Sequence, residues 1–181
     1  MAFPEEKLLS RTLAGLPFPA VASNPPPDLV LTPLRGKPRT VEQLLTTFHL
    51  LIVALDPFTD ESAWLLPTAT RILQVFEQAD CRVAWLVAGT PEECQQFLGP
   101  WSEEILTFSD PDRTAVKGFG LQRLPAILLV RMDGQVAGAE GWQPMAWRRV
   151  TDEAARLTGW RPPSYPGPRD PGAFEGSPAL G

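Results

Sequence analysis

The sequence predicts a three-layer α/β domain, in which a mixed central β-sheet is flanked by helices. Short apolar runs, such as residues 49–55 and 81–88, alternate with segments of helical periodicity. Asp133-Gly134 separates two further apolar runs and is a strong hairpin signal. A closing helix is expected over 144–158. Strands separated by helices pair in parallel, and the hairpin adds an antiparallel pair, so the sheet is mixed.

The first half of the domain is expected to contain two strands and two helices. Residues 28–34 alternate in polarity, which is typical of a half-buried strand. Thr40 and Gln43 have the spacing of a capping box, which predicts a short helix. The run 49–55 is continuously apolar, as in a strand buried on both faces. A longer helix is then predicted over 61–79.

The second half follows the same alternation. Residues 81–88 form a second buried strand, and Thr90 with Glu93 repeats the capping box, with Pro91 at the first helical position. The remaining predicted elements are a strand at 104–108, a helical turn at 110–116 with Asp110 and Asp112 as its N-terminal acids, hairpin strands at 126–131 and 135–140, and the closing helix, which ends at Gly159.

The 21 prolines divide the chain into three parts. Residues 1–27 are expected to hold an N-terminal helix after Pro4 and a proline-rich lead-in. Residues 28–160 form the α/β domain. Residues 161–181 contain six prolines and four glycines, too few backbone donors and too little apolar surface for a core. This tail is expected to be extended or mobile, and its Tyr165 and Phe174 could dock on the body or on a partner.

Composition excludes several classes of function. Sixteen basic residues, scattered along the chain, face 21 acidic ones, which argues against a nucleic-acid partner. No apolar run approaches the roughly 20 residues of a membrane-spanning helix. The start, M-A-F-P-E-E-K, has acidic residues where a signal peptide has positive charge, so we expect a cytoplasmic protein. We expect neither metal nor cofactor, because the single histidine, His49, has no partner at ligand spacing.

The stretch from Phe119 to Gly141, F-G-L-Q-R-L-P-A-I-L-L-V-R-M-D-G-Q-V-A-G-A-E-G, resembles the second half of a thioredoxin. This resemblance implies a thioredoxin-like three-layer sandwich in which Pro125, preceded by Leu124, has a cis peptide bond. The lead segment and Ser109-Asp110-Pro111-Asp112 resemble the peroxiredoxin and alkyl hydroperoxide reductase (AhpC/TSA) branch. A looser similarity is to the thioredoxin-like domain that ends some flavin-dependent aromatic-ring hydroxylases. Together the resemblances cover residues 16–158.

The resemblance also locates a site that has lost its thiols. Thioredoxins have C-x-x-C at the start of the helix after the first core strand, with a proline five residues after the second cysteine. Counting back from Pro67 places Thr59-Asp60-Glu61-Ser62 at those positions. The peroxiredoxin motif T-x-x-C keeps Thr59 and again puts Ser62 at the cysteine. A serine hydroxyl is far less acidic than a thiol and forms no disulfide, so we expect a redox-inactive site.

Neither cysteine replaces the missing thiols directly. Cys81 begins a predicted strand and Cys94 lies in the helix after it, so they are too far apart for a disulfide. Cys81 is interpreted as a core residue. Cys94 follows the carboxyl end of its strand and is the one thiol with a route to the site, although a structural role is the simpler interpretation.

These observations lead to a catalytically degenerate domain that binds a protein partner or a small ligand. The binding residues are predicted to be Phe58, Trp64, Leu124 and Trp142, with the tryptophans serving either as core or as the walls of an apolar groove. The alternative is a thiol-dependent oxidoreductase or peroxidase of the same superfamily, which would use Cys94 or a partner's thiol. Whether the protein is an enzyme, and its oligomeric state, stay open at this point.

Overall fold

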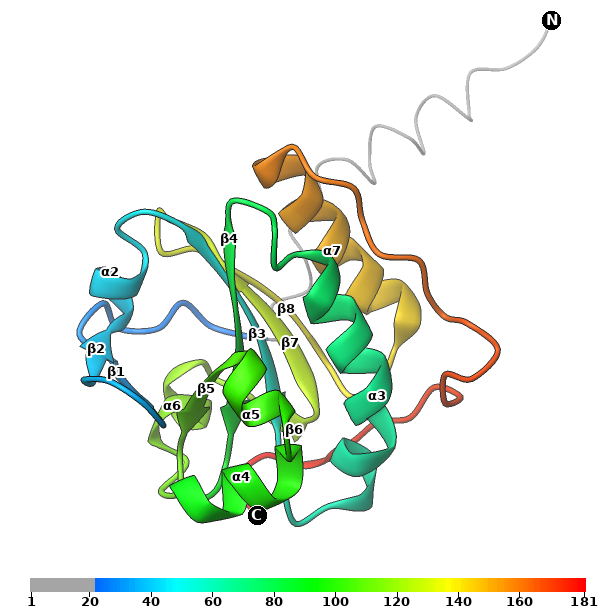
Figure 1. Ribbon diagram of the computed structural model, residues 1–181, viewed down its shortest axis with the longest axis horizontal. Helices are drawn as coiled ribbons and strands as arrows, with labels where there is room; N and C mark the ends of the chain where they lie inside the picture. Colours follow the sequence, from blue (N-terminus) through cyan, green and yellow to red (C-terminus); the bar gives the residue numbers. More distant parts are fainter. Residues whose placement is uncertain (1–21) are drawn as a thin grey trace, which may run out of the picture.

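The computed structural model describes residues 22–181, and the helix predicted after Pro4 lies outside that range. A seven-stranded mixed sheet forms the middle layer, in the order β2-β1-β5-β4-β3-β7-β8. Helices cover both of its faces (Figure 1). The elements are β1 (Val30–Pro33), β2 (Arg39–Thr40), α2 (Val41–Leu44), β3 (His49–Leu55), α3 (Asp60–Val75), β4 (Cys81–Val87), α4 (Pro91–Leu98), α5 (Trp101–Glu104), β5 (Leu106–Ser109), α6 (Thr114–Gly118), β6 (Arg123–Leu124), β7 (Ala126–Val130), β8 (Val136–Glu140), α7 (Pro144–Thr158) and β9 (Ser177–Pro178).

Strand β3 lies at the centre of the sheet, as its unbroken apolar run predicts. It pairs in parallel with β4 and antiparallel with β7. Alternate side chains enter two separate cores: Leu51, Val53 and Leu55 pack under one set of helices, and Leu50 and Ile52 under the other. Because both faces are covered, the strand has no polar side. Its last residue, Leu55, comes directly before the predicted site.

The capping boxes form as predicted. The Thr40 hydroxyl accepts the Gln43 N–H while Gln43 accepts the Thr40 N–H, and Thr90 and Glu93 make the same reciprocal pair. The β7–β8 hairpin also forms, and Gly134 takes a positive φ of 83° in its turn. The closing helix α7 has the predicted limits and ends at Gly159, with φ 64°.

Four short elements were not predicted: β2, α5, β6 and β9. The helical turn expected to begin at Asp110 also starts later, at Thr114. The Asp110 carboxylate nevertheless accepts the N–H groups of Ala115 and Val116, at 3.0 and 2.9 Å. It therefore satisfies the free donors of α6 from outside the helix, as an N-terminal acid does.

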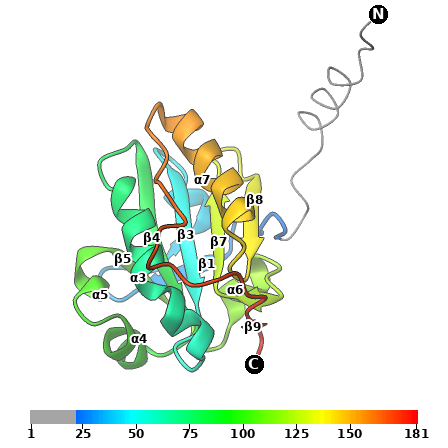
Figure 2. The ribbon, with the colours of Figure 1, turned by 90° about the vertical axis from the view of Figure 1, so that its right-hand side faces the viewer.

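The tail is extended and packed on the body. It runs across the face that carries α3 and α7 and then turns under the sheet to the C-terminus (Figure 2). The Trp160 indole donates to the Val75 carbonyl at 2.7 Å, and the Tyr165 hydroxyl lies 2.7 Å from that of Thr151. Further along, Asp170 accepts two hydrogen bonds from Arg71. The tail was expected to be extended or mobile; in the structure it is extended, and its aromatic side chains pack on the body.

Candidate functional site

The predicted motif begins at the N-cap of α3 and continues through its first turn, directly after the tight loop of residues 56–59 (the motif loop) that joins β3 to α3. Thr59 is the N-cap of α3, but its hydroxyl makes no capping bond and instead donates to the Asp56 carbonyl at 3.2 Å. Asp60 and Glu61 lie in the first turn, where carboxylates favour the helix dipole. Ser62 is completely buried, and its Oγ accepts the Asp56 backbone N–H at 2.9 Å. The serine thus serves as a structural acceptor that closes the loop onto the helix.

A buried ion pair lies directly beside this loop. Asp56 Oδ2 accepts a hydrogen bond from Arg113 Nη2 at 2.8 Å, while Asp56 Oδ1 accepts the Phe58 N–H at 2.9 Å. The Asp56 side chain is 3% exposed and that of Arg113 is 18% exposed. Arg113 also donates through Nη1 to the Ala179 carbonyl at 2.6 Å. The pair therefore connects the motif loop to the C-terminal end of the tail.

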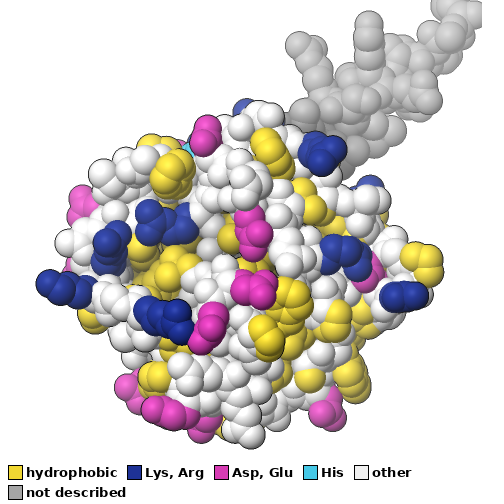
Figure 3. Space-filling model, in the orientation of Figure 1, with side chains coloured by type: hydrophobic (Ala, Val, Ile, Leu, Met, Phe, Trp, Pro, Cys, Tyr) yellow, Lys and Arg dark blue, Asp and Glu magenta, His cyan; other side chains and the backbone are white. Residues whose placement is uncertain are grey.

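The four predicted binding residues separate into two pairs. Phe58 and Trp64 are exposed, at 66% and 58%, and Trp64 packs edge-on against Phe174 of the tail, with ring centroids 6.0 Å apart. Apolar side chains gather over α3 and the tail in Figure 3. Leu124 and Trp142 are fully buried. The expectation that Trp142 could wall an open groove is wrong, because the tail covers it.

The tail reaches Trp142 and Leu124 through backbone pairing. Trp142 and Phe174 exchange two backbone hydrogen bonds, at 2.8 and 2.9 Å. The Trp142 indole donates to the Pro171 carbonyl at 2.8 Å. Strand β9 then pairs antiparallel with β6, which contains Leu124. The Leu124–Pro125 peptide bond is cis, as the resemblance implied.

Both cysteines are buried and free, which agrees with the prediction that they form no disulfide. Burial raises the pKa of Cys81 to about 12 and that of Cys94 to about 11. Cys94 Sγ contacts the Val87 and Gly89 carbonyls, at 3.9 and 3.6 Å, and the side chain has no exposed surface. The route from Cys94 to the motif that the sequence suggested is therefore closed.

His49 lies at the opposite end of β3 from Ser62, so the two do not meet. Its Nδ1 accepts the Met132 N–H at 3.1 Å, and burial together with the positive charge of Arg131 lowers its pKa. His49 therefore has a structural role at the start of its strand. Among residues 22–181, no three His, Cys, Asp or Glu side chains are grouped as metal ligands would be.

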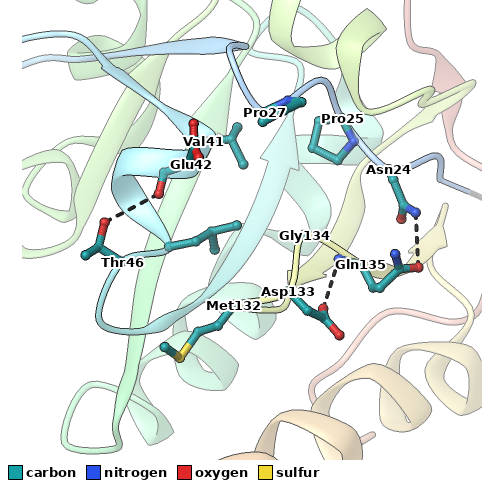
Figure 4. Close-up of a pocket in the computed structure, with 11 residues that line it drawn as sticks. Asn24, Pro25, Pro27, Val41, Glu42, Thr46, Met132, Asp133, Gly134 and Gln135 are labelled. Carbon is teal, nitrogen blue, oxygen red and sulfur yellow. Dashed lines mark hydrogen bonds between the residues drawn. The ribbon is translucent and has the colours of Figure 1, made fainter.

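Two of the hollows on the described part of the chain lie away from the motif. One, of about 580 Å³, lies between α2 and the β7–β8 turn, where Asn24 bonds to Gln135 (Figure 4). The other, of about 180 Å³, has an apolar floor and a rim that includes Arg35, Lys37, Arg39 and Arg82. Basic side chains surround it in Figure 3. Three of these basic residues are close in the sequence, at 35, 37 and 39, and the fold brings Arg82 to the same rim.

Sequence reasoning missed Asp56 and Arg113 as a unit. The two are 57 residues apart, and the fold alone brings them together. Arg113 has a left-handed backbone, with φ 57°, a conformation that side chains other than Asn, Asp and Gly rarely adopt. The available signal was the position of Asp56 immediately after a buried strand, where a lone acid needs a cationic partner.

Among the described residues, no helix combines the length and apolarity that crossing a bilayer requires. No protein-family model and no curated protein matches the sequence.

Solved structures do match, at low identity. DsbF from Mycobacterium tuberculosis is 16% identical, with a TM-score of 0.57, over 74% of this chain and 94% of that one. The peroxidoxin BcpB of the same organism is 16% identical, with a TM-score of 0.57, over 76% and 96%. A variant of peroxiredoxin Q from Xanthomonas campestris is 16% identical, with a TM-score of 0.58, over 78% and 97%. By its fold this chain is thioredoxin-like, and its structural neighbours include both disulfide oxidoreductases and peroxiredoxins.

Proposed function

We propose that this protein is a thioredoxin-like binding module that carries out no thiol chemistry and docks a protein partner beside the motif loop. The proposal rests on one observation: the position at which the resemblance expects the reactive thiol holds Ser62, which is buried and committed to the Asp56 N–H. No histidine lies near this hydroxyl to activate it, because His49 is at the other end of β3.

The state of the cysteines supports the same proposal. A thiol with a pKa of about 11 or 12 has on the order of one thiolate in a thousand or fewer at pH 8. A buried thiol is also inaccessible to a peroxide or to a disulfide. Electron transfer through Cys81 or Cys94 would require the core to open first.

The docking surface in this proposal consists of Phe58 and Trp64. Both are large, apolar and more than half exposed; Phe58 precedes the N-cap of α3, and Trp64 lies within the first turns of the helix. Aromatic side chains of this kind are the usual anchors of protein interfaces. A partner that covers them would also touch Phe174, because Trp64 already packs against it.

The test combines an activity assay with a matched pair of variants. The wild-type protein is expected to show no turnover of peroxide or of a model disulfide above the blank, with thioredoxin or glutathione as reductant. In crosslinking capture followed by mass spectrometry, Phe58→Ser with Trp64→Ser is expected to lose a partner that the wild type retains. The control, Met132→Ser with Met145→Ser, removes two other exposed apolar side chains and should retain that partner.

A second candidate function is a thiol-dependent oxidoreductase or peroxidase. The solved structures that resemble this chain favour it, since they include a secreted disulfide oxidoreductase of Mycobacterium tuberculosis and peroxiredoxins. Turnover in the assay that Cys94→Ala abolishes would establish this second function and overturn the first. If both double variants capture the partner equally well, the partner does not dock on Phe58 and Trp64.

A further inference from the structure

The C-terminal segment, residues 175–180, is held on the body as an extended peptide is held by a receptor. Ser177 and Pro178 pair antiparallel with Arg123 and Leu124 of β6. The Ala179 N–H donates to the Gln122 carbonyl at 2.8 Å. Addition of a strand to a short exposed sheet edge is a recurrent way in which proteins bind peptides.

Most of the contacts are hydrogen bonds to main-chain atoms of the segment, so they do not depend on the identity of its side chains. Arg123 Nη1 donates to the Gly176 carbonyl at 3.0 Å, and Arg113 Nη1 donates to the Ala179 carbonyl at 2.6 Å. Asp56 holds the other terminal nitrogen of Arg113, which fixes the direction of the guanidinium. The motif loop therefore positions a donor for the main chain of whatever lies along β6.

Two positions restrict what fits. The Ala179 side chain is 1% exposed and packs into the core that contains Leu121 and Leu124, so a small side chain is required there. Gly176 has φ +86°, and a Cβ on it would lie 2.6 Å from the Leu124 carbonyl oxygen. Leu180, in contrast, is 57% exposed and is free to vary.

The segment can leave without the rest of the tail. Upstream, the tail is fastened separately by the paired hydrogen bonds between Trp142 and Phe174. Strand β9 has two residues, and so short a pairing opens at low cost.

We propose that the β6 edge and Arg113 form a binding site for an extended peptide segment of a partner protein, and that residues 175–180 occupy this site in cis until the partner displaces them. The occupant is a strand with a glycine and a small residue three positions later, as in Gly176 to Ala179. This inference rests on the proposed function, because it specifies which chemistry the proposed protein partner must have. A tethered competitor acts at an effective concentration of millimolar order, so a free peptide must bind the intact protein more weakly than it binds the vacated site.

The test measures binding of a labelled peptide, residues 173–181, to full-length proteins by fluorescence anisotropy. In Ala179→Glu a buried carboxylate would be unpaired, so the segment should leave its site. Gly176→Val removes it by backbone strain instead. Both variants are expected to bind the peptide at least about tenfold more tightly than the wild type. Leu180→Glu adds the same charge at an exposed position and should behave as the wild type does. The peptide carrying Ala179→Glu should not bind.

Hydrogen exchange of the wild-type protein gives a second measurement that needs no variant. The Ala179 amide should exchange at least tenfold faster than the Phe174 amide, because the segment opens before the upstream bridge. Equal peptide affinity in wild type and Ala179→Glu, whether tight or absent, would overturn the proposal. So would Ala179 exchange as slow as that of β3, or a wild-type dimer in which the segments are exchanged between copies.

The outcomes separate this inference from the proposed function. Peptide binding to Ala179→Glu, together with equal partner capture by the two double variants described above, would retain the β6 site and reject docking at Phe58 and Trp64. Capture that depends on Phe58 and Trp64, without any peptide binding, would do the reverse.

Discussion

The Ser62 hydroxyl satisfies a buried backbone donor, and its contribution to stability follows from that contact. The Asp56 N–H lies in a residue that is 2% exposed, and Ser62 Oγ accepts it at 2.9 Å. A buried donor without an acceptor costs more free energy than a hydrogen bond contributes on average. A residue that resembles the remnant of a catalytic motif therefore has a structural role of its own.

Ser62→Ala should lower the free energy of unfolding by about 1–3 kcal/mol, because the Asp56 N–H would then be buried without an acceptor. Urea denaturation measures this change. Thr59→Ala is the matched control in the same loop. Its hydroxyl donates to the Asp56 carbonyl, which also accepts the Thr59 backbone N–H at 3.3 Å, so the loss should be below about 0.5 kcal/mol. Equal losses for the two variants would contradict the role assigned to Ser62.

Among the elements, those with a local signal were predictable from the sequence. Thr40 and Thr90 carry their capping partners three residues away, and Asp133-Gly134 contains the whole turn signal. Strands β6 and β9 have no such signal. They form because residues 123–124 and 177–178 meet in space, and a pairing of two residues leaves no periodicity to detect.

The candidate site likewise has features that could be predicted from the sequence and features that could not. The serine at position 62 and its place at the start of a helix could be predicted, because the spacing to Pro67 is local. The burial of Trp142 and Leu124 could not, because it depends on a tail whose composition is typical of unfolded chain. That tail folds onto the body through a few buried polar contacts, such as the Tyr165–Thr151 pair, and composition does not report these.

The contact of the tail with α7 can be measured separately. Tyr165→Phe should lower the free energy of unfolding by about 0.5–1.5 kcal/mol, because it removes the 2.7 Å hydrogen bond to Thr151. Thr151→Val alone should have a similar effect, since it leaves the buried Tyr165 hydroxyl unpaired. The double variant should lose less than the sum of the two single losses. Strict additivity in this double-mutant cycle would show that the two hydroxyls do not interact.

For the whole molecule, the tail acts as a strap that connects α3, α7 and β6. It bonds to α3 through Asp170, to α7 through Tyr165 and to β6 through β9. Asp170 is the charged anchor: its side chain is 1% exposed, and Arg71 lies 2.7 Å away. Release of this anchor should therefore affect the stability of the entire fold.

The pH dependence of stability tests that role. Burial by itself would raise the pKa of Asp170, but hydrogen bonds from Arg71, the Gly167 N–H and Thr68 together hold it below its ordinary value. A carboxyl with a lowered folded pKa contributes stability that is fully present above its unfolded pKa, about 4, and is lost as the pH falls through the folded pKa. Burial raises the pKa of Glu140, which acts in the opposite sense, so a difference between two proteins is required.

Asp170→Asn should reduce the free energy of unfolding by about 1–3 kcal/mol at pH 7, because hydrogen bonds to a buried charge are lost. The gap between wild type and variant should narrow as the pH falls below about 4, because Asp170 of the unfolded wild-type chain then binds a proton that the folded carboxylate accepts only at a lower pH. Urea titrations of both proteins from pH 3 to 7 measure this, and Glu140 cancels in the difference. Asp133→Asn is the control: its pair with Arg131 is exposed and should contribute less than about 0.5 kcal/mol. If the difference in unfolding free energy between wild type and Asp170→Asn stays constant with pH, the charge of Asp170 does not stabilise the attachment of the tail.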